Sequence, residues 1–415
     1  MERYIGKSTM VLGKDRYYSL DCQKTQLNNN VLVVGASGTG KTRSIVSPNI
    51  LMASGSYVIS DPKGILYDKY KKYLQAQGYE VKKLDFTNPR KSCGYNFFNY
   101  IKNTQDIVKV SHMMVNSEEG VRSTADPFWD RAAQLLLQAV IAYLQEACSR
   151  RDRNLKNVLR LVSLCQIDEN DSSSQTVLDV MFEELEKTKP NSYAAKTYKK
   201  FRIAAGRTLR SILITLNSTL GLMDTPEIEK MTEEDTIDIE SIGKTKTAIF
   251  VVVSDTDRSL DRLVNIFFSQ TMNVLCEYAD KRCINNELPV PVRFILDDFA
   301  TNCKIDDFPR MISSIRSRGI SVMLMIQAES QLKKGYGDDD KTIISNCDTY
   351  IYLGGNDVET AKAVAERLDI PAKKVLNMPV GTNWIFRRGE EAYNGVNLQL
   401  ETLNAEKRVD FGTVR

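Results

Sequence analysis

The residues most clearly suited to a chemical role run from Gly35 to Thr42 and have the sequence GASGTGKT. They fit the spacing G-x-x-x-x-G-K-[ST] at each fixed position, which is the pattern of a loop that binds nucleotide phosphates. Glycines in such a loop let the main chain approach phosphate oxygens closely, with N–H groups pointing inward. Lys41 would reach the β- and γ-phosphates, and the Thr42 hydroxyl would bind Mg²⁺. The expected ligand-binding residues of this loop are Gly35, Ala36, Ser37, Gly38, Thr39, Gly40, Lys41 and Thr42.

A pair of carboxylates forms a second candidate site. The run 292–296 is mostly apolar and is followed directly by Asp297 and Asp298. Beside a phosphate-binding loop, such a strand end is typical of nucleotide hydrolysis. Asp297 would hold Mg²⁺, and Asp298 would orient or deprotonate the attacking water. The alternative is a buried strand that ends in an ordinary acidic turn.

Three further polar residues flank the apolar run 320–326. Gln327 follows this run, and an amide at a strand end could detect the γ-phosphate or its water; alternatively, Gln327 caps the next helix. Arg316 and Arg318 precede the run, near a helix end. One of them could act as an arginine finger on the nucleotide of a neighbouring subunit. The alternative is an exposed helix with ordinary cations at its C-terminus.

Apolar runs that alternate with helical patterns must position these residues. The run 31–34 reads as a buried strand before the phosphate-binding loop, and 56–60 reads as a second strand. The second strand ends in Asp61-Pro62-Lys63-Gly64, a turn at the carboxyl end of a strand, where open α/β sheets bind ligands. Asp61 and Lys63 are therefore expected to contact the nucleotide. With further strands expected at 80–85, 247–253, 292–296, 320–326 and 349–353, the alternation predicts an α/β fold with a parallel sheet covered by helices.

The middle of the sequence has a different pattern, because helical periodicity runs through it without a competing strand. Helices are expected at 126–148, 154–165, 175–188, 192–205 and 208–222, with Asp126 and Pro127 as the start signal of the first. We predict that residues 1–102 form the first part of a nucleotide-binding domain. Residues 103–234 would form an inserted all-α domain, and residues 235–415 the second part of the nucleotide-binding domain.

Composition excludes several other classes of protein. The chain has 415 residues and a formal net charge of +3, which is too small to indicate a nucleic-acid partner, so any basic surface must be local. No apolar run is long enough to span a bilayer. The eight cysteines are scattered without a C-x-x-C pair, which argues against a zinc site or a disulfide framework. His112 is the single histidine, so histidine-based metal chemistry and a Ser-His-Asp triad are nearly excluded.

Several stretches together resemble the TraG/TraD-type coupling proteins of type IV secretion. Their order and spacing carry the resemblance, which covers roughly residues 28–370. The matching stretches are GASGTGKT, Asp61-Pro62-Lys63-Gly64, Pro127-Phe128-Trp129, Phe250-Val251-Val252-Val253-Ser254-Asp255-Thr256-Asp257, Ile295-Leu296-Asp297-Asp298-Phe299-Ala300, Ile315-Arg316-Ser317-Arg318, Ile326-Gln327-Ala328-Glu329-Ser330-Gln331-Leu332, Asn346-Cys347-Asp348 and Leu353-Gly354-Gly355.

The resemblance implies a RecA-like P-loop NTPase core with an inserted all-α domain. It implies a homo-hexameric ring that binds ATP and Mg²⁺ between subunits and moves single-stranded DNA. Carried over by motif, Asp297 and Asp298 are the Walker B pair, Gln327 is the γ-phosphate sensor, and Arg316 or Arg318 is the trans-acting arginine. The partners would be relaxase and relaxosome proteins, recognised by the inserted helices, together with the membrane subunits of the secretion channel. The expected location is cytoplasmic, at the inner face of the cell membrane.

Two departures from the family pattern change what is expected. Family members usually carry two transmembrane helices ahead of the nucleotide-binding domain, and this sequence has no comparable run. The chain would then be a soluble part of a longer protein, or a member recruited by another membrane subunit. The second carboxylate is often Glu in the family, whereas this chain has Asp298. The shorter side chain would hold water less closely, so slow turnover is expected.

Three functions are compatible with these motifs. The first is an ATP-driven single-stranded DNA translocase that couples its substrate to the secretion channel. The second is a motor of the FtsK/HerA group that acts on duplex DNA. The third is an ATP-gated platform that docks relaxase or effector proteins and hydrolyses little ATP. The Asp-Pro-Lys-Gly turn and the size of the helical insertion favour the first function over the second.

Overall fold

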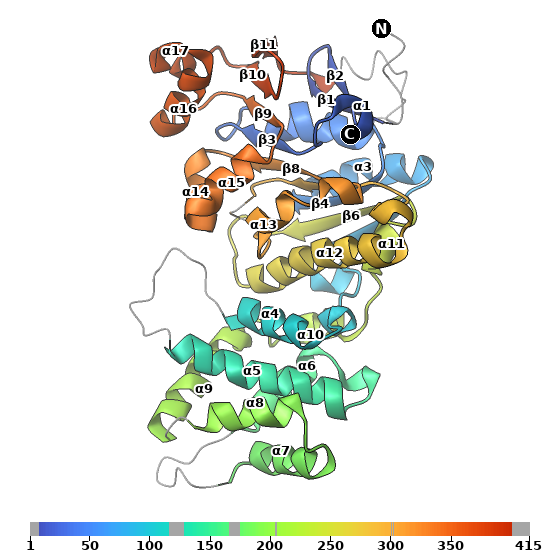
Figure 1. Cartoon of the computed structure of the whole chain (residues 1–415), viewed down its shortest axis with the longest axis vertical. Helices are drawn as coiled ribbons and strands as arrows, with labels where there is room; N and C mark the ends of the chain where they lie inside the picture. Colours follow the sequence, from blue (N-terminus) through green and yellow to red (C-terminus); the bar gives the residue numbers. More distant parts are fainter. Residues whose placement is uncertain are drawn as a thin grey trace. The chain divides into compact units, whose positions relative to one another are not determined.

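The computed structural model describes residues 8–115, 128–165, 175–203, 206–299, 301 and 303–400 (Figure 1). The chain divides into two compact units. The first unit comprises Met1–Thr87, Asp238–Thr256 and Thr271–Arg415, and the second comprises Asn88–Ile237 and Asp257–Gln270. The second unit includes residues 103–234, the predicted insertion, together with short flanking segments and the separate segment Asp257–Gln270. Its start signal, Asp126 and Pro127, lies outside the described residues.

A nine-stranded sheet forms the centre of the first unit within the described residues. Its order is β11-β10-β9-β3-β8-β7-β4-β6-β5. The strands β3 to β9 run parallel, and β10 and β11 form an antiparallel edge. Their bounds are β3 Val31–Val34, β4 Ser56–Pro62, β5 Glu80–Asp85, β6 Thr247–Val253, β7 Val292–Leu296, β8 Ile320–Ile326, β9 Thr349–Tyr352, β10 Thr382–Arg387 and β11 Tyr393–Val396. The α/β class predicted from the sequence is confirmed.

The strand sequences explain why this sheet is buried on both faces. Every residue of β3, β6 and β7 is buried, and so are all but one of β8. Continuous apolar runs of this kind are typical of parallel strands that helices cover on both sides. A separate antiparallel hairpin, β1 (Thr9–Gly13) with β2 (Arg16–Ser19), packs its β1 strand into the same core.

The strand order differs from the order along the chain, and this difference builds the site. β4 follows β3 in sequence, yet it pairs with β6 and β7 instead. β3 pairs with β8 and β9, and β8 pairs with β7. Parallel strands end at the same edge, so the residues that follow β3, β8 and β7 come together there.

Helices complete the first unit. The phosphate-binding loop leads into a π-helical turn, η1, which continues directly into α2. The bounds are α1 Cys22–Thr25, η1 Thr42–Val46, α2 Ser47–Leu51, α3 Ile65–Ala76, α11 Ile239–Ile242, η5 Ile284–Asn286, α13 Phe308–Ile312, η6 Arg316–Arg318, α14 Glu329–Tyr336, η7 Gly337–Asp339, α15 Asp340–Ser345, α16 Val358–Leu368 and α17 Ala372–Leu376. Helix α12, Asp261–Arg282, contributes its first part to the second unit and its remainder to the first.

The described part of the second unit is helical. Stacked rings of Phe182 and Tyr198 lie 4.1 Å apart at its core, and the Tyr198 hydroxyl donates to Asp179, which also pairs with Arg202. Asp179 further completes a capping box with Thr176. The bounds are η2 Pro89–Lys91, η3 Phe97–Tyr100, α4 Thr104–Val115, α5 Phe128–Ala147, η4 Arg150–Asp152, α6 Leu155–Ser163, α7 Val177–Thr188, α8 Tyr193–Arg202, α9 Gly206–Gly221 and α10 Pro226–Glu233.

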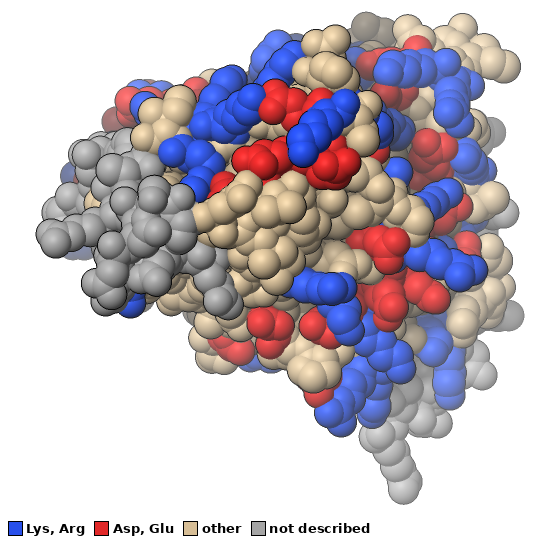
Figure 2. Space-filling view, turned by 90° about the horizontal axis from the view of Figure 1, so that it is seen from below, with Lys and Arg blue, Asp and Glu red and all other residues tan. Residues whose placement is uncertain are grey.

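Charged side chains of both signs are interspersed on the surface that Figure 2 shows. Neither Lys and Arg nor Asp and Glu cover that face as a continuous field. The view agrees with the modest formal net charge of +3. A partner of strong single-signed charge would therefore have to bind through local clusters on this face.

Asn49 provides a test of how the hairpin is held to the helix behind the phosphate-binding loop. Its buried amide accepts from the Val11 N–H and donates to the carbonyls of Val11 and Ile45. Asn49→Ala should lower the free energy of unfolding of the first unit by about 2–4 kcal/mol, because buried groups of Val11 lose their partners. Thermal melting would show this as a lowered transition, while the exposed control Asn394→Ala should melt like the original chain. An unchanged transition in Asn49→Ala would contradict this account.

Candidate functional site

The phosphate-binding loop has the backbone that its glycines predict. Gly40 has a φ of 89°, in the left-handed region that favours glycine. At Gly35 the constraint is space, because a Cβ there would lie 2.6 Å from the Thr39 hydroxyl oxygen and 2.9 Å from the Cβ of Leu353. The Ala36 N–H donates to the Gly354 carbonyl after β9, which anchors the start of the loop. The loop is thus a tightly packed turn at the end of β3.

Lys41 lies over the loop with its ammonium group inside. The residue is only 8% exposed, and its Nζ donates to the Gly35 carbonyl at 2.7 Å and to the Ala36 carbonyl at 3.2 Å. Burial lowers the pKa of Lys41, while the nearby carboxylates of Asp298 and Asp297 act in the opposite direction. A largely desolvated ammonium group interacts strongly with an anion that reaches it.

The Thr42 hydroxyl donates to the Asp297 carboxylate at 2.7 Å. This hydrogen bond joins the two motifs that the sequence places 255 positions apart. Asp297 is 6% exposed, and burial raises its pKa, whereas the hydrogen bond from Thr42 lowers it. The Ser60 hydroxyl donates to the Asp297 carbonyl and supports the strand end. A hydroxyl and a carboxylate are the oxygen ligands that Mg²⁺ prefers, so the donor set at Thr42 and Asp297 fits this ion.

Asp298 and Gln327 lie together at the ends of β7 and β8. The Gln327 side-chain amide donates to the Asp298 carboxylate at 3.5 Å, a long contact. Gln327 does not cap the next helix through its side chain, because Ala328 holds the N-cap position of α14. Asp298 has a φ of 52°, which is uncommon for a residue with a side chain and is found at functional sites. The roles expected of Asp298 and Gln327 stay predictions.

Asp61 and Lys63 have structural partners at the end of β4. Asp61 is 1% exposed and accepts from the N–H groups of Leu66 and Tyr67 in the first turn of α3. Burial raises the pKa of Asp61 to about 6 despite these two hydrogen bonds. Lys63 forms an ion pair of 3.1 Å with Asp255, which follows the adjacent strand β6. A nucleotide contact by either residue stays a prediction.

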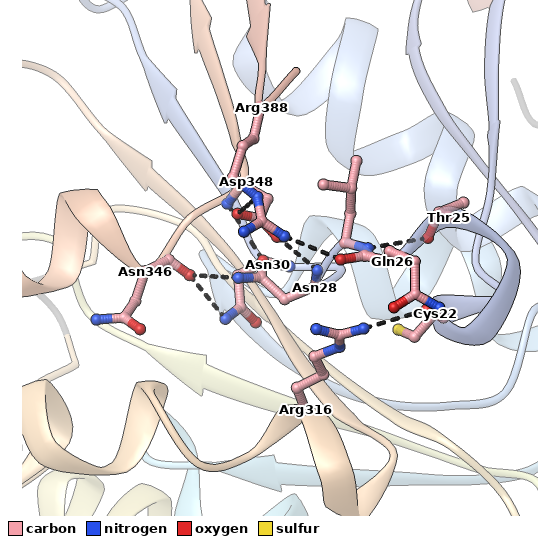
Figure 3. A network of polar contacts seen from close by, with 10 residues as sticks. Cys22, Thr25, Gln26, Asn28, Asn30, Arg316, Asn346, Asp348 and Arg388 are labelled. Atoms are coloured by element: carbon pink, nitrogen blue, oxygen red, sulfur yellow. Dashed lines mark hydrogen bonds and ion pairs between the residues drawn. The ribbon is translucent and has the colours of Figure 1, made fainter. Parts of the chain in front are cut away.

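Arg316 and Arg318 lie at the opposite edge of the sheet from the phosphate-binding loop. They precede β8, whose seven residues span roughly 20 Å. Arg318 is held by the Asp280 carboxylate through two contacts of 2.8 Å. The exposed Arg316 donates to the Cys22 carbonyl at 3.2 Å (Figure 3). Neither arginine reaches the phosphate-binding loop of its own chain.

A polar network lies on one side of Arg316 at this edge (Figure 3). The Asp348 carboxylate accepts from the Asn28 N–H at 2.6 Å and pairs with Arg388 at 2.8 Å. Arg388 also donates to the Gln26 carbonyl. The segment between α1 and β3 is therefore clamped by residues from the far end of the chain. Arg388 carries no local sequence signal that could have identified it.

A second contact that the motifs did not indicate reaches the phosphate-binding loop itself. The Asn397 side chain, just after β11, donates to the Thr39 carbonyl at 3.3 Å. The two residues are 358 positions apart, and Asn397 belongs to no recognisable motif. The end of the described chain therefore forms part of the surroundings of the loop.

These features define a protein with a RecA-like α/β core that carries a P-loop. The site combines a glycine loop after β3, a buried lysine, and a hydroxyl–carboxylate pair that fits Mg²⁺. The chain belongs to the family described as type IV secretory system conjugative DNA transfer, whose model matches residues 2–369. The TraG/TraD-type resemblance seen in the sequence is thereby confirmed.

Known relatives and structures agree with this assignment. Protein VirD4 of Rhizobium radiobacter is 25% identical over 350 residues, covering 81% of this chain and 48% of its own length. The chain thus spans about half the length of the curated relatives it matches. Among solved structures, the conjugative coupling protein TrwBdeltaN70 in its unbound monoclinic form has a TM-score of 0.69 and 17% identity, covering 94% of this chain and 88% of its own. TrwB in complex with ADP and Mg²⁺ has a TM-score of 0.68 and 18% identity, covering 94% and 89%.

Among the described residues, every helix is too short or too polar to cross a bilayer.

Asp61 makes the stability of the first unit depend on pH. Because burial raises its pKa from 3.8 to about 6, the protonated form is favoured in the folded state, and this contribution to stability is lost as pH rises through about 6. Asp61→Asn cannot titrate, so its stability relative to the original chain should increase by about 2.4 kcal/mol between pH 4 and pH 7. Denaturant unfolding at several pH values, without nucleotide or Mg²⁺, measures this difference. A difference that stays flat with pH would contradict the assignment.

Proposed function

We propose that this chain binds and hydrolyses ATP with Mg²⁺ and uses the reaction to move relaxase-bound single-stranded DNA into a type IV secretion channel. The hydrogen bond between Thr42 and Asp297 carries the proposal, because it joins the phosphate-binding loop to the carboxylate strand in one buried site. Family membership supports the coupling role, and the solved structure of TrwB in complex with ADP and Mg²⁺ supports the ligand.

Each residue of the site would have a separate chemical role. Lys41 would exchange its hydrogen bonds with loop carbonyls for the phosphates, since a phosphate oxygen is the stronger acceptor. Thr42 and Asp297 would hold Mg²⁺, which when bound would neutralise charge on the phosphates. Asp298 would orient the attacking water, and Gln327, which contacts Asp298, would respond to the γ-phosphate. The short Asp298 side chain would hold water less closely than Glu, so we propose a slow turnover.

The arrangement of the two arginines favours Arg316 as the trans-acting residue. Arg318 is held by both oxygens of Asp280, and releasing it would break a paired interaction. Arg316 is exposed and bound to one main-chain carbonyl, so its guanidinium retains donors for a phosphate. Because Arg316 lies at the edge opposite its own phosphate-binding loop, it can meet only the nucleotide of another copy. A closed ring satisfies this head-to-tail requirement, and we propose a homo-hexamer.

The remaining partners follow from the family. The helices of the second unit would recognise relaxase and relaxosome proteins, and the assembly would act with membrane subunits of the channel at the inner face of the cell membrane. Contacts with DNA would be mainly to phosphates, tolerant of sequence and strongly dependent on salt. A docking platform with little hydrolysis is the second candidate, since Asp298 replaces the longer carboxylate.

A steady-state ATPase assay tests the proposed motor. The rate per subunit should rise with protein concentration and with single-stranded DNA, because the shared sites form only in the assembled ring. Lys41→Ala should lower the rate to background by removing the phosphate ligand. Duplex DNA serves as the comparison for strand preference. A low rate that ignores both concentration and DNA, with intact ATP binding, would contradict the motor and leave the docking platform.

The two arginines can be separated by a matched pair of variants. Arg316→Ala should reduce the DNA-stimulated rate by about a thousandfold while ATP still binds, as for loss of an arginine finger. Arg318→Ala removes a surface ion pair and should change the rate by less than about twofold.

Mixing two inactive variants tests whether the arginine acts between subunits. Combining Arg316→Ala with Lys41→Ala should restore activity, because a ring with random order has about one quarter of its interfaces intact. A mixture that stays inactive, although both variants enter the same ring, would contradict action in trans.

A further inference from the structure

The antiparallel edge hairpin contains a fully buried asparagine. Asn383 lies in β10, is fully buried, and donates through its Nδ2 to the Asn397 Oδ1 at 2.9 Å. A Cβ at Gly395 would lie 3.0 Å from the Asn383 Oδ1, so the missing side chain at Gly395 leaves room for the amide. The fold therefore holds a polar group in its core.

Asn397 continues this contact to the phosphate-binding loop. Its Oδ1 accepts from Asn383, and its Nδ2 donates to the Thr39 carbonyl at 3.3 Å. The main chain of Asn397 is fixed as well, since its N–H donates to the Gly381 carbonyl at 2.8 Å. The three groups form one directed chain of hydrogen bonds from Asn383 through Asn397 to Thr39.

The Thr39 carbonyl sets the donor-to-acceptor direction of these hydrogen bonds. A carbonyl can only accept, so Asn397 must present its Nδ2 to Thr39 and its Oδ1 to Asn383. Asn383 must then present its own Nδ2, and its Oδ1 is left buried without a hydrogen-bond partner among the described residues. An orphaned buried amide oxygen opposes folding, and such groups are rare in native structures. The orientation that leaves it orphaned is the one that holds the Thr39 carbonyl.

We propose that Asn383 and Asn397 are positioning residues that hold the phosphate-binding loop in its nucleotide-binding shape. Peptide bonds in the described chain are trans, so the Thr39 carbonyl and the Gly40 N–H point in opposite directions. Holding that carbonyl toward the hairpin fixes the plane of the peptide and aims the Gly40 N–H away from the hairpin. Gly40, with its φ of 89°, has the conformational freedom that makes such a restraint useful. The inference rests on the proposed binding of ATP at this loop.

Equilibrium titration of the full chain with a fluorescent ATP analogue and Mg²⁺ tests the proposal. Asn397→Ala and Asn397→Leu should each raise the dissociation constant by about tenfold, which corresponds to about 1.4 kcal/mol. Leu has the same number of side-chain heavy atoms and the same branching as Asn but cannot donate, so a role in packing alone would leave its affinity unchanged. Asn394→Ala, in the same hairpin but exposed, is the matched control and should bind like the original chain. Melting temperatures without nucleotide verify that each variant is folded.

The chain of hydrogen bonds also predicts non-additive effects. Asn383→Ala should weaken binding through Asn397, so the double variant Asn383→Ala/Asn397→Ala should bind no more weakly than Asn397→Ala alone. Wild-type affinity in folded Asn397→Ala and Asn397→Leu would overturn the proposal, as would fully additive losses. Lys41→Ala separates this failure from failure of the proposed function. If the original chain binds no nucleotide, the proposed function fails; if it binds and Lys41→Ala does not, only the inference on the asparagines is in question.

Discussion

The hydrogen bond between Thr42 and Asp297 depends on the order of three strands. β8 alone separates β3 from β7, so the two strand ends lie about 10 Å apart, within reach of a loop that crosses the end of β8. If β4 lay between β3 and β8, a further strand would separate the two motifs. Because β8 ends between them, Gln327 is delivered to the same place, next to Asp298. One sheet order thus assembles a loop, two carboxylates and an amide from three distant segments.

Burial gives this site its electrostatic character. Lys41 and Asp297 are both more than nine-tenths buried. Burial lowers the pKa of Lys41 and raises the pKa of Asp297, so in each case it favours the neutral form. Nearby opposite charges partly offset this effect, since Asp298 and Asp297 act on Lys41, and Lys41 acts on Asp297. Isolated buried charges are costly, so a site with both signs is best completed by a ligand that also carries both signs. A nucleotide triphosphate with Mg²⁺ has this character, which connects the burial of these residues to the proposed ligand.

Local patterns predict the strands and the loop, because these depend on residues close together in sequence. The apolar runs at Val31–Val34 and Ile320–Ile326 appear as buried strands with the predicted extent. Long-range partners leave no local signal: Asp280, which holds Arg318, lies on α12, and Asp255, which pairs with Lys63, follows another strand. For the same reason the motifs could not distinguish Arg316 from Arg318. That distinction depends on which arginine a folded neighbour already holds.

The antiparallel edge explains how distant residues reach both ends of the sheet. β10 runs against β9, so its end places Arg388 at the edge where β9 and β3 begin, beside Asp348. β11 reverses direction again and runs parallel to β9, so its end returns toward the edge that carries the phosphate-binding loop. Asn397 follows β11 directly and contacts Thr39 there. One hairpin therefore contacts the segment that leads into β3 and also the loop that leaves it. Parallel strands can be joined only by a long crossover connection, whereas antiparallel strands can be joined by a short turn. The two changes of strand direction therefore let the end of the chain reach both edges of the sheet through short connections.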